Sequence, residues 1–183
     1  MLGVAAFLIG VLLTGYVHAS EARLTDIVLT NTRDHVVVYF RVADCFTEEM
    51  VEAIHNGIPA TFTFFVRLHE RRRFWPDRSI ADLKISHEIR YDGLKKNYRV
   101  RLSERDNETH TVTDFEEAKK MMSEIVALEI TELANLRTGE RYQVKMMAEL
   151  DTIKLPFYLD YVFFFLSLWD FETDWFTVDF KYL

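Results

Sequence analysis

This sequence of 183 residues contains a single cysteine, few glycines and none of the common catalytic motifs. Because Cys45 has no second cysteine to pair with, no intramolecular disulfide can form, and the fold must depend on its core. A lone cysteine is usually a small buried hydrophobic residue, and a reactive or intermolecular thiol is the alternative. Only six glycines are present, and they form no Gly-rich phosphate-binding loop.

Signatures of enzymes and metal sites are also missing. No serine lies in a Gly-x-Ser-x-Gly elbow, and no His-x-x-x-His or cysteine pair offers zinc ligands. The pairs His69-Glu70 and His87-Glu88 resemble metal ligands, but adjacent residues of a strand point to opposite faces and cannot chelate together. Alternation places His87 on an apolar face, which favours a core histidine. We therefore expect no catalytic residue, metal or cofactor, and an enzyme is a distant alternative.

An apolar or neutral run occupies residues 2–17 and is followed by small residues at the positions that a signal peptidase reads. This pattern predicts a secretory signal peptide over residues 1–19, cleaved after Ala19. No Lys or Arg precedes the run, so an uncleaved anchor is the alternative, although the run is slightly short for a spanning helix. We expect an exported protein, periplasmic or envelope-associated, with one domain over residues 20–183.

Alternating apolar residues dominate the remaining chain and predict strands. The expected strands are 23–30, 35–42, 61–71, 81–91, 98–102, 126–130, 142–150 and 173–182. Helices are expected over 47–55, capped by Thr47, over a segment that starts at Thr113 or Asp114, and over 158–169. Thr113 and Glu116 have the spacing of a capping box. About eight strands and two or three short helices, without regular helical crossovers, favour a mainly β fold, an antiparallel β-sandwich.

Charge is distributed unevenly along the chain, whose formal net charge is −7. Residues 67–105 carry twelve Lys or Arg and six Asp or Glu, and they include Arg71-Arg72-Arg73 directly before Phe74-Trp75. The simplest interpretation is a solvated strand face whose charges protect a sheet edge. The functional interpretation is contact with phospholipid headgroups or with an acidic surface of a protein partner. Nucleic acid is not expected as a ligand of an acidic exported protein.

Residues 155–180 contain eleven aromatic side chains among 26. Such a segment either packs in the core or docks on a membrane or a membrane protein. Because Phe163, Phe164 and Phe165 are consecutive, no rotation of a helix hides all three on one face. Trp169 and Trp175 follow, and a contiguous exposed patch in this stretch would mark an interaction site.

Three segments carry a family resemblance: the early hairpin ARLTDIVLTNTRDHVVVYFRV, the segment RYQVKMMAELDTIKLPFYL and the closing WDFETDWFTVDF. Together they resemble the bacterial exported family catalogued as domain of unknown function 4390, over most of the mature chain. Genes of that family often neighbour those of nitrogen-regulation-type sensor kinases, so the resemblance implies an envelope or signalling role. It implies no catalytic residue.

The sequence thus predicts a non-catalytic envelope protein that binds a protein partner, as an accessory to a membrane sensor kinase or at the membrane surface. A module that binds a lipid or a small apolar ligand, with the aromatic stretch as its pocket wall, is the alternative. The candidate interaction surface comprises Arg71, Arg72, Arg73, Phe74, Trp75, Phe163, Phe164, Phe165, Trp169 and Trp175.

Overall fold

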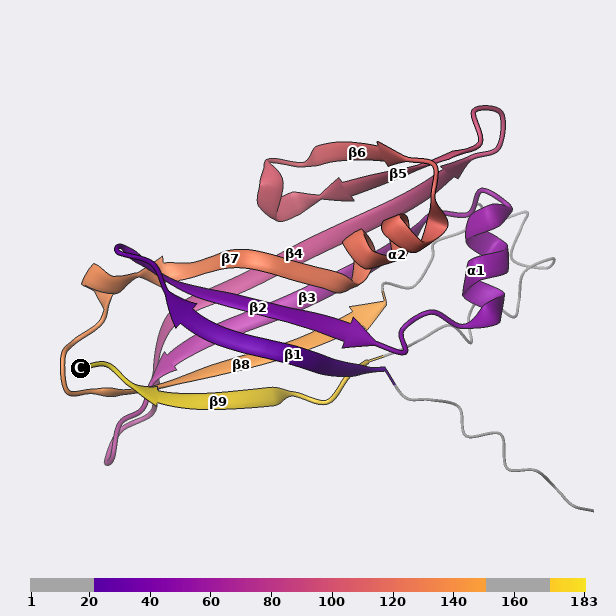
Figure 1. Ribbon diagram of the computed structural model, residues 1–183. Coiled ribbons are helices and arrows are strands. Elements are labelled where there is room, and N and C mark those ends of the chain that lie inside the picture. Colours follow the sequence, from indigo (N-terminus) through magenta and orange to yellow (C-terminus); the bar gives the residue numbers. More distant parts are fainter. Residues whose placement is uncertain (1–21, 151–171) are drawn as a thin grey trace, which may run out of the picture.

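The structure, a computed structural model, describes residues 22–150 and 172–183, which contain nine strands and two α-helices (Figure 1). The strands are β1 (Arg23–Asn31), β2 (His35–Ala43), β3 (Ala60–Glu70), β4 (Arg78–Asp92), β5 (Asn97–Leu102), β6 (Glu108–Val112), β7 (Glu124–Glu132), β8 (Arg141–Leu150) and β9 (Phe176–Lys181). The helices are α1 (Glu48–His55) and α2 (Phe115–Ser123), and two short 3-10 turns are η1 (Ser103–Arg105) and η2 (Leu133–Asn135).

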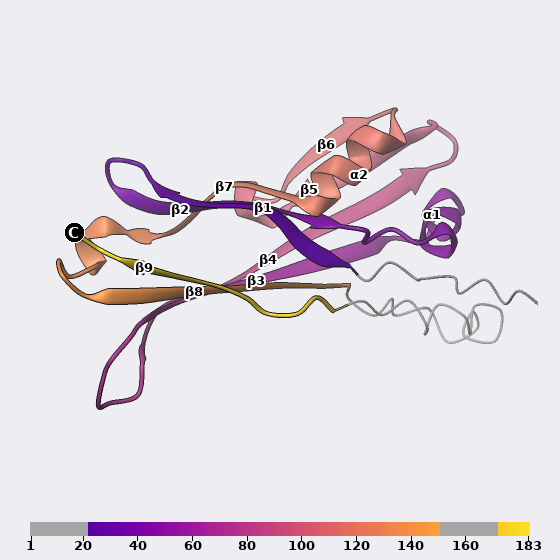
Figure 2. The ribbon, with the colours of Figure 1, turned by 60° about the horizontal axis from the view of Figure 1, so that its bottom comes forward.

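The strands form two antiparallel sheets. The smaller sheet has the order β1-β2-β7, and the larger has the order β6-β5-β4-β3-β8-β9. Figure 2 shows the smaller sheet as a layer above β3, β8 and β9, while β4, β5 and β6 rise beside α2. The predicted antiparallel β-sandwich is therefore confirmed.

The core lies between the two sheets and is built from alternate residues of the central strands. On β3, Phe62, Phe64 and Val66 are each 0% exposed, whereas the residues between them belong to the outer face. Phe40 of β2 meets Phe64 edge to face, with ring centroids 5.9 Å apart. Because burying one such side chain stabilises a protein by about 1.5–3 kcal/mol, this alternation determines which faces of the sheets meet.

The two helices lie at the end of the sandwich where β4 ends and β5 begins, which we call the helical end (Figure 1). Thr47 caps α1 as predicted, because its hydroxyl accepts the N–H of Met50 at 3.2 Å. The expected capping box at Thr113 is wrong: the N-cap of α2 is Asp114, whose carboxylate accepts the N–H of Glu116 at 3.1 Å. Both residue types cap well, so the sequence alone does not choose between them.

Aromatic rings pack against one another beneath the helices. Phe46 lies 5.1 Å from Phe62, and Phe115 lies 4.7 Å from His55 and 5.1 Å from Tyr98, measured between ring centroids. Such contacts stabilise a core beyond the area they bury, by about 0.5–1.5 kcal/mol per pair. The helical end is therefore closed by a packed aromatic cluster.

The edge strand β6 is absent from the sequence-based prediction, which has only a turn at residues 106–108. The strand reads ETHTV and lacks an alternating apolar side. Its position follows from pairing with β5, in which Tyr98 lies opposite Val112 and Leu102 opposite Glu108. A polar edge strand of this kind is difficult to predict from its own residues, because most of its contacts are made with the neighbouring strand β5.

Two predicted features lie outside the described residues: the signal peptide over residues 1–19 and the helix over 158–169. The last strand, β9, falls within the predicted range 173–182. Neither α1 nor α2, the α-helices of the described part of the chain, is long and apolar enough to cross a membrane.

Candidate functional site: the basic end of the larger sheet

The outer face of the larger sheet carries an apolar contact beside a pair of cations in the middle of its central strands. Phe65 of β3 lies in register between Lys84 of β4 and Met147 of β8. Two residues further along β3, Arg67 lies in register with Lys145. On this face Phe65 and the buried Met147 therefore lie next to a pair of cations, Arg67 and Lys145.

The strands end at a surface cleft of about 920 Å³ that is lined mainly by cations. Its lining residues are Arg71, Arg72, Arg73, Gly139, Glu140, Arg141, Asp179, Phe180 and Lys181. The N–H of Arg71 donates to the carbonyl of Arg141 at 2.8 Å, and Arg141 lies in register with Lys181 of β9. Pairing of three strands thus gathers cations from distant parts of the chain. This cleft and the loop 71–77 form what we call the basic end.

Hydrogen bonds fix some of these cations and leave others available. Arg71 donates to the Gln143 side chain at 3.3 Å, and Gln143 donates to Asp179 at 2.9 Å. Within residues 22–150 and 172–183, no carboxylate forms an ion pair with Arg73, Arg141 or Lys181. These three positive charges are therefore available to an anionic ligand.

The loop of the basic end is pinned at its base and projects from the sandwich (Figure 2). Asp77 accepts the N–H of Arg72 at 3.1 Å and pairs with the guanidinium of Arg71 at 3.2 Å. Phe74 and Trp75 follow at the tip, where they are 84% and 75% exposed. The projecting tip therefore carries two aromatic side chains that the chain itself leaves largely uncovered.

Glu70 lies on the inner side of the same end, where arginine side chains enclose its carboxylate. Arg137 reaches both carboxylate oxygens, at 2.7 and 2.9 Å, Arg78 donates at 2.8–3.0 Å, and Arg72 lies 3.6 Å away. Burial by itself would raise the pKa of the Glu70 carboxyl, but the hydrogen bonds from Arg137 and Arg78 outweigh it and hold the pKa below its ordinary value. Glu70 thus anchors the basic loop to the turn before β8.

The structure separates the predicted interaction surface into parts. Arg71, Arg72 and Arg73 line the cleft, and Phe74 and Trp75 form the tip. Trp175 lies elsewhere, on the outer face, with the guanidinium of Arg67 4.8 Å from its ring centroid. Phe163, Phe164, Phe165 and Trp169 lie outside the described residues.

Sequence reasoning missed four contributors to the basic end: Glu70, Arg137, Arg141 and Lys181. Arg137, Arg141 and Lys181 are distant from residues 71–77 in the chain, and the β3–β8–β9 register brings them there. Glu70 directly precedes the loop, at the end of β3, but its side chain lies on the buried face. No local pattern distinguishes Arg141 from an ordinary strand-edge charge. Finding these residues required the strand pairing, which a single sequence does not give.

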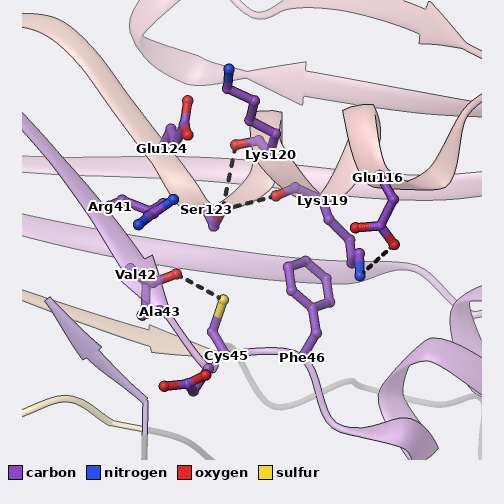
Figure 3. Close-up of a pocket in the computed structure, with 11 residues that line it drawn as sticks. Arg41, Val42, Ala43, Cys45, Phe46, Glu116, Lys119, Lys120, Ser123 and Glu124 are labelled. Carbon is purple, nitrogen blue, oxygen red and sulfur yellow. Dashed lines mark hydrogen bonds and ion pairs between the residues drawn. The ribbon is translucent and has the colours of Figure 1, made fainter. Parts of the chain in front are cut away.

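A second cleft, of about 610 Å³, lies beside Cys45 between the end of β2 and α2 (Figure 3). The Cys45 thiol is 4% exposed and donates to the Val42 carbonyl at 3.4 Å. Burial raises its pKa to about 12, so the reactive thiolate is scarce at neutral pH. Cys45 is therefore the buried hydrophobic residue that the sequence predicts.

His87 is buried in the core, as its place on the apolar face predicts. Its Nδ1 lies 3.2 Å from the Met122 carbonyl at the end of α2, and its Nε2 lies 3.1 Å from the Glu104 carboxylate. The Met122 carbonyl can only accept, so Nδ1 carries the hydrogen of that bond, and Nε2 faces the Glu104 carboxylate. Burial alone would raise the pKa of Glu104, but the bond from His87 lowers it.

Three or more His, Cys, Asp or Glu side chains do not converge as metal ligands anywhere in the described residues. The family model described as "Domain of unknown function (DUF4390)" matches residues 19–179. The chain belongs to the DUF4390 family. No curated protein and no solved structure matches this DUF4390 chain, so its site is interpreted from its own geometry.

Proposed function

We propose that the protein is a non-catalytic, exported protein of the cell envelope that binds a membrane protein partner along the outer face of its larger sheet. The observation that carries this proposal is the stack of Arg67 on Trp175, whose ring keeps 39% of its surface exposed. Tryptophan and arginine are the residue types that most often dominate binding at protein interfaces. The stack gives a partner a rigid, partly exposed anchor.

The surroundings of this stack indicate the chemistry of the partner. The partly buried Phe65 lies beside Arg67, and Lys84 lies 5.4 Å from the Phe65 ring centroid. Asp82 is the carboxylate that pairs with Arg67, at 3.3 Å. Cations around an apolar centre favour a partner surface with an apolar contact and an acidic rim.

Export and the kind of partner are supported by the sequence. The apolar run over residues 2–17, ending before Ala19-Ser20, favours secretion. Genes of the family often neighbour those of sensor kinases, so the family resemblance implies an envelope or signalling role. The protein would then act as an envelope accessory whose partner is embedded in the membrane.

Photocrosslinking in living cells tests the proposal. A photoreactive amino acid replaces Trp175, and a control replaces Leu94, which is 98% exposed in the β4–β5 turn. We expect a specific adduct with a membrane protein from position 175 and none from position 94, and Arg67→Glu should weaken that adduct. Identical adducts from both positions, or crosslinks only within the chain, would contradict the proposal.

The alternative, a module for a lipid or small apolar ligand, has less support. The clefts at the basic end, beside Cys45 and between β4 and β7 are open surface clefts whose linings mix charged and apolar residues, and none of the three is an enclosed apolar cavity. The aromatic stretch expected to wall an apolar pocket lies mostly outside the described residues. A ligand that co-purifies in native mass spectrometry would favour this alternative.

A further inference from the structure

We infer that the basic end is a membrane-binding site whose ligand is the headgroup layer of a bilayer that contains anionic phospholipid. The site lies at the end of β3, apart from the Arg67–Trp175 stack. The inference goes beyond the proposed protein partner and does not depend on it, because lipid alone would suffice for binding.

Charge gives the first argument. Together with Glu70 and the two arginines that donate to it, the basic end gathers seven cations against four carboxylates, a formal net charge of +3 on a protein whose total is −7. The cations are Arg71, Arg72, Arg73, Arg78, Arg137, Arg141 and Lys181, and the carboxylates are Glu70, Asp77, Glu140 and Asp179. An anionic bilayer repels most of such a molecule and attracts this end, so the protein approaches in one orientation.

The cations without ion pairs suit phosphate groups. Arg73, Arg141 and Lys181 line the cleft, while Arg71 is held by Asp77 and Gln143. Arginine donates to phosphate oxygens in a forked geometry, and lysine contributes a point charge. The cleft therefore offers the unpaired positive charges of these three side chains beside the loop, where headgroup phosphates would lie.

The tip gives the second, independent argument. Phe74 and Trp75 are 84% and 75% exposed, and the guanidinium of Arg73 lies 5.4 Å from the Phe74 ring centroid. Aromatic side chains of this kind concentrate at the membrane–water interface, with arginine or lysine at the headgroup level. Asp77 pins the base of the loop, so the tip is already held in a projecting position before it binds.

A bilayer fits this shape better than a protein does. The loop projects from the sandwich (Figure 2), Phe74 and Trp75 are exposed in its middle, and cations at its base line the neighbouring cleft. A protein would need a matching apolar pocket ringed by acids, whereas the interfacial layer of an anionic bilayer presents both components over its whole surface.

The first experiment reads the tip directly. In the full chain, Trp169→Phe and Trp175→Phe leave Trp75 as the only tryptophan. The control adds Leu94→Trp to Trp75→Phe in the same background, which moves the reporter to the opposite end of β4. Vesicles of phosphatidylcholine alone, or with phosphatidylglycerol, are titrated and the emission is followed. Both reporter proteins contain residues 2–17, so any binding through that segment contributes equally to both emission shifts, and the difference between the shifts reports the tip.

We expect the Trp75 emission to shift to shorter wavelength on vesicles with phosphatidylglycerol, and the shift to fall in high salt, while the control reporter does not shift. Arg73→Gln or Arg141→Gln should each raise the lipid concentration at the titration midpoint about fivefold. Lys95→Gln, in the turn between β4 and β5, should raise it less than about twofold. Equal shifts from both reporters, or no Trp75 shift on phosphatidylglycerol, would overturn the inference.

A Trp75 shift on native membranes without one on pure lipid vesicles would also overturn it, because the ligand would then be a protein. The crosslink from position 175 is measured separately, in cells. If the adduct is absent and the Trp75 emission still shifts on vesicles, the proposed partner is rejected and the membrane site stands. If the adduct forms and the Trp75 emission does not shift, the membrane site is rejected and the proposed partner stands.

Discussion

Aromatic side chains gather at both ends of the larger sheet, but the helical end buries them and the basic end exposes them. Phe62 at the helical end is 0% exposed and lies 5.1 Å from Phe46, whereas Phe74 at the basic end is 84% exposed. Two helices cover the first end, while at the second Asp77 pins a loop that extends away from the core. An aromatic residue in the sequence therefore indicates burial only where another helix or strand packs over it.

The largest expected effect tests the buried side of this comparison. Phe62→Ala should lower the free energy of unfolding by about 3–5 kcal/mol, because it removes a fully buried ring and leaves a cavity beneath the helices. Chemical denaturation measures the change. A loss below about 1 kcal/mol would mean that the helical end is loosely packed, and the contrast between the ends would fail.

His87→Leu should lower the free energy of unfolding by about 2–3 kcal/mol, because it leaves the Glu104 carboxylate and the Met122 carbonyl without their donor. The companion variant His87→Leu with Glu104→Leu should recover much of this loss, since no charge then remains unpaired. If the double variant is as unstable as the sum of the two single ones, His87 and Glu104 are not coupled, and their contact does not stabilise the fold.

At the basic end, Glu70→Gln should cost about 1 kcal/mol at pH 7, because arginines 37–57% exposed to solvent hold the carboxylate and water screens them. The folded-state pKa of Glu70 lies below its ordinary 4.5, so its stabilisation is present above that pH and is lost as the pH falls through the folded value. Denaturation at pH 7 and pH 3 should show the difference between wild type and variant shrinking in acid. A constant difference would exclude the ion pairs as its source.

The smallest effect is expected at the tip. Phe74→Ala with Trp75→Ala should change the free energy of unfolding by less than about 0.5 kcal/mol, since both side chains are mostly exposed. Denaturation beside Leu94→Ala, a matched exposed apolar residue, measures it. A large loss would show that these rings support the fold, and the argument for an interaction role would weaken.

Most of the fold was predictable from alternation. The pattern of residues 81–91 places His87 and Ile89 in the core, where both are 0% exposed, and the alternation of residues 61–71 locates β3. The loop at residues 74–77 was also predictable, because Pro76 and the turn residues around it interrupt two strong strands, but the place of Arg72 and Arg73 in that loop was not.

The full site was not predictable, because it depends on which strands pair. Arg141 and Lys181 reach the cleft only through the β3–β8–β9 register. Glu70 at the end of β3 pairs with Arg137 in the turn before β8, 67 residues further along the chain. The sequence also grouped Trp175 with the loop. The register instead puts Trp175 six residues from Lys181, about 20 Å along an extended strand.

Cys45 is 4% exposed and its thiol is bonded to the Val42 carbonyl. The reactivity of this thiol in the unmodified protein therefore measures how often the core opens. A thiol reagent can react only while the sandwich is open, so the labelling rate at a given reagent concentration reports the opening frequency without any engineered probe. Since the thiol is the only one in the chain, a single mass increment on the intact protein would follow opening even inside a living cell.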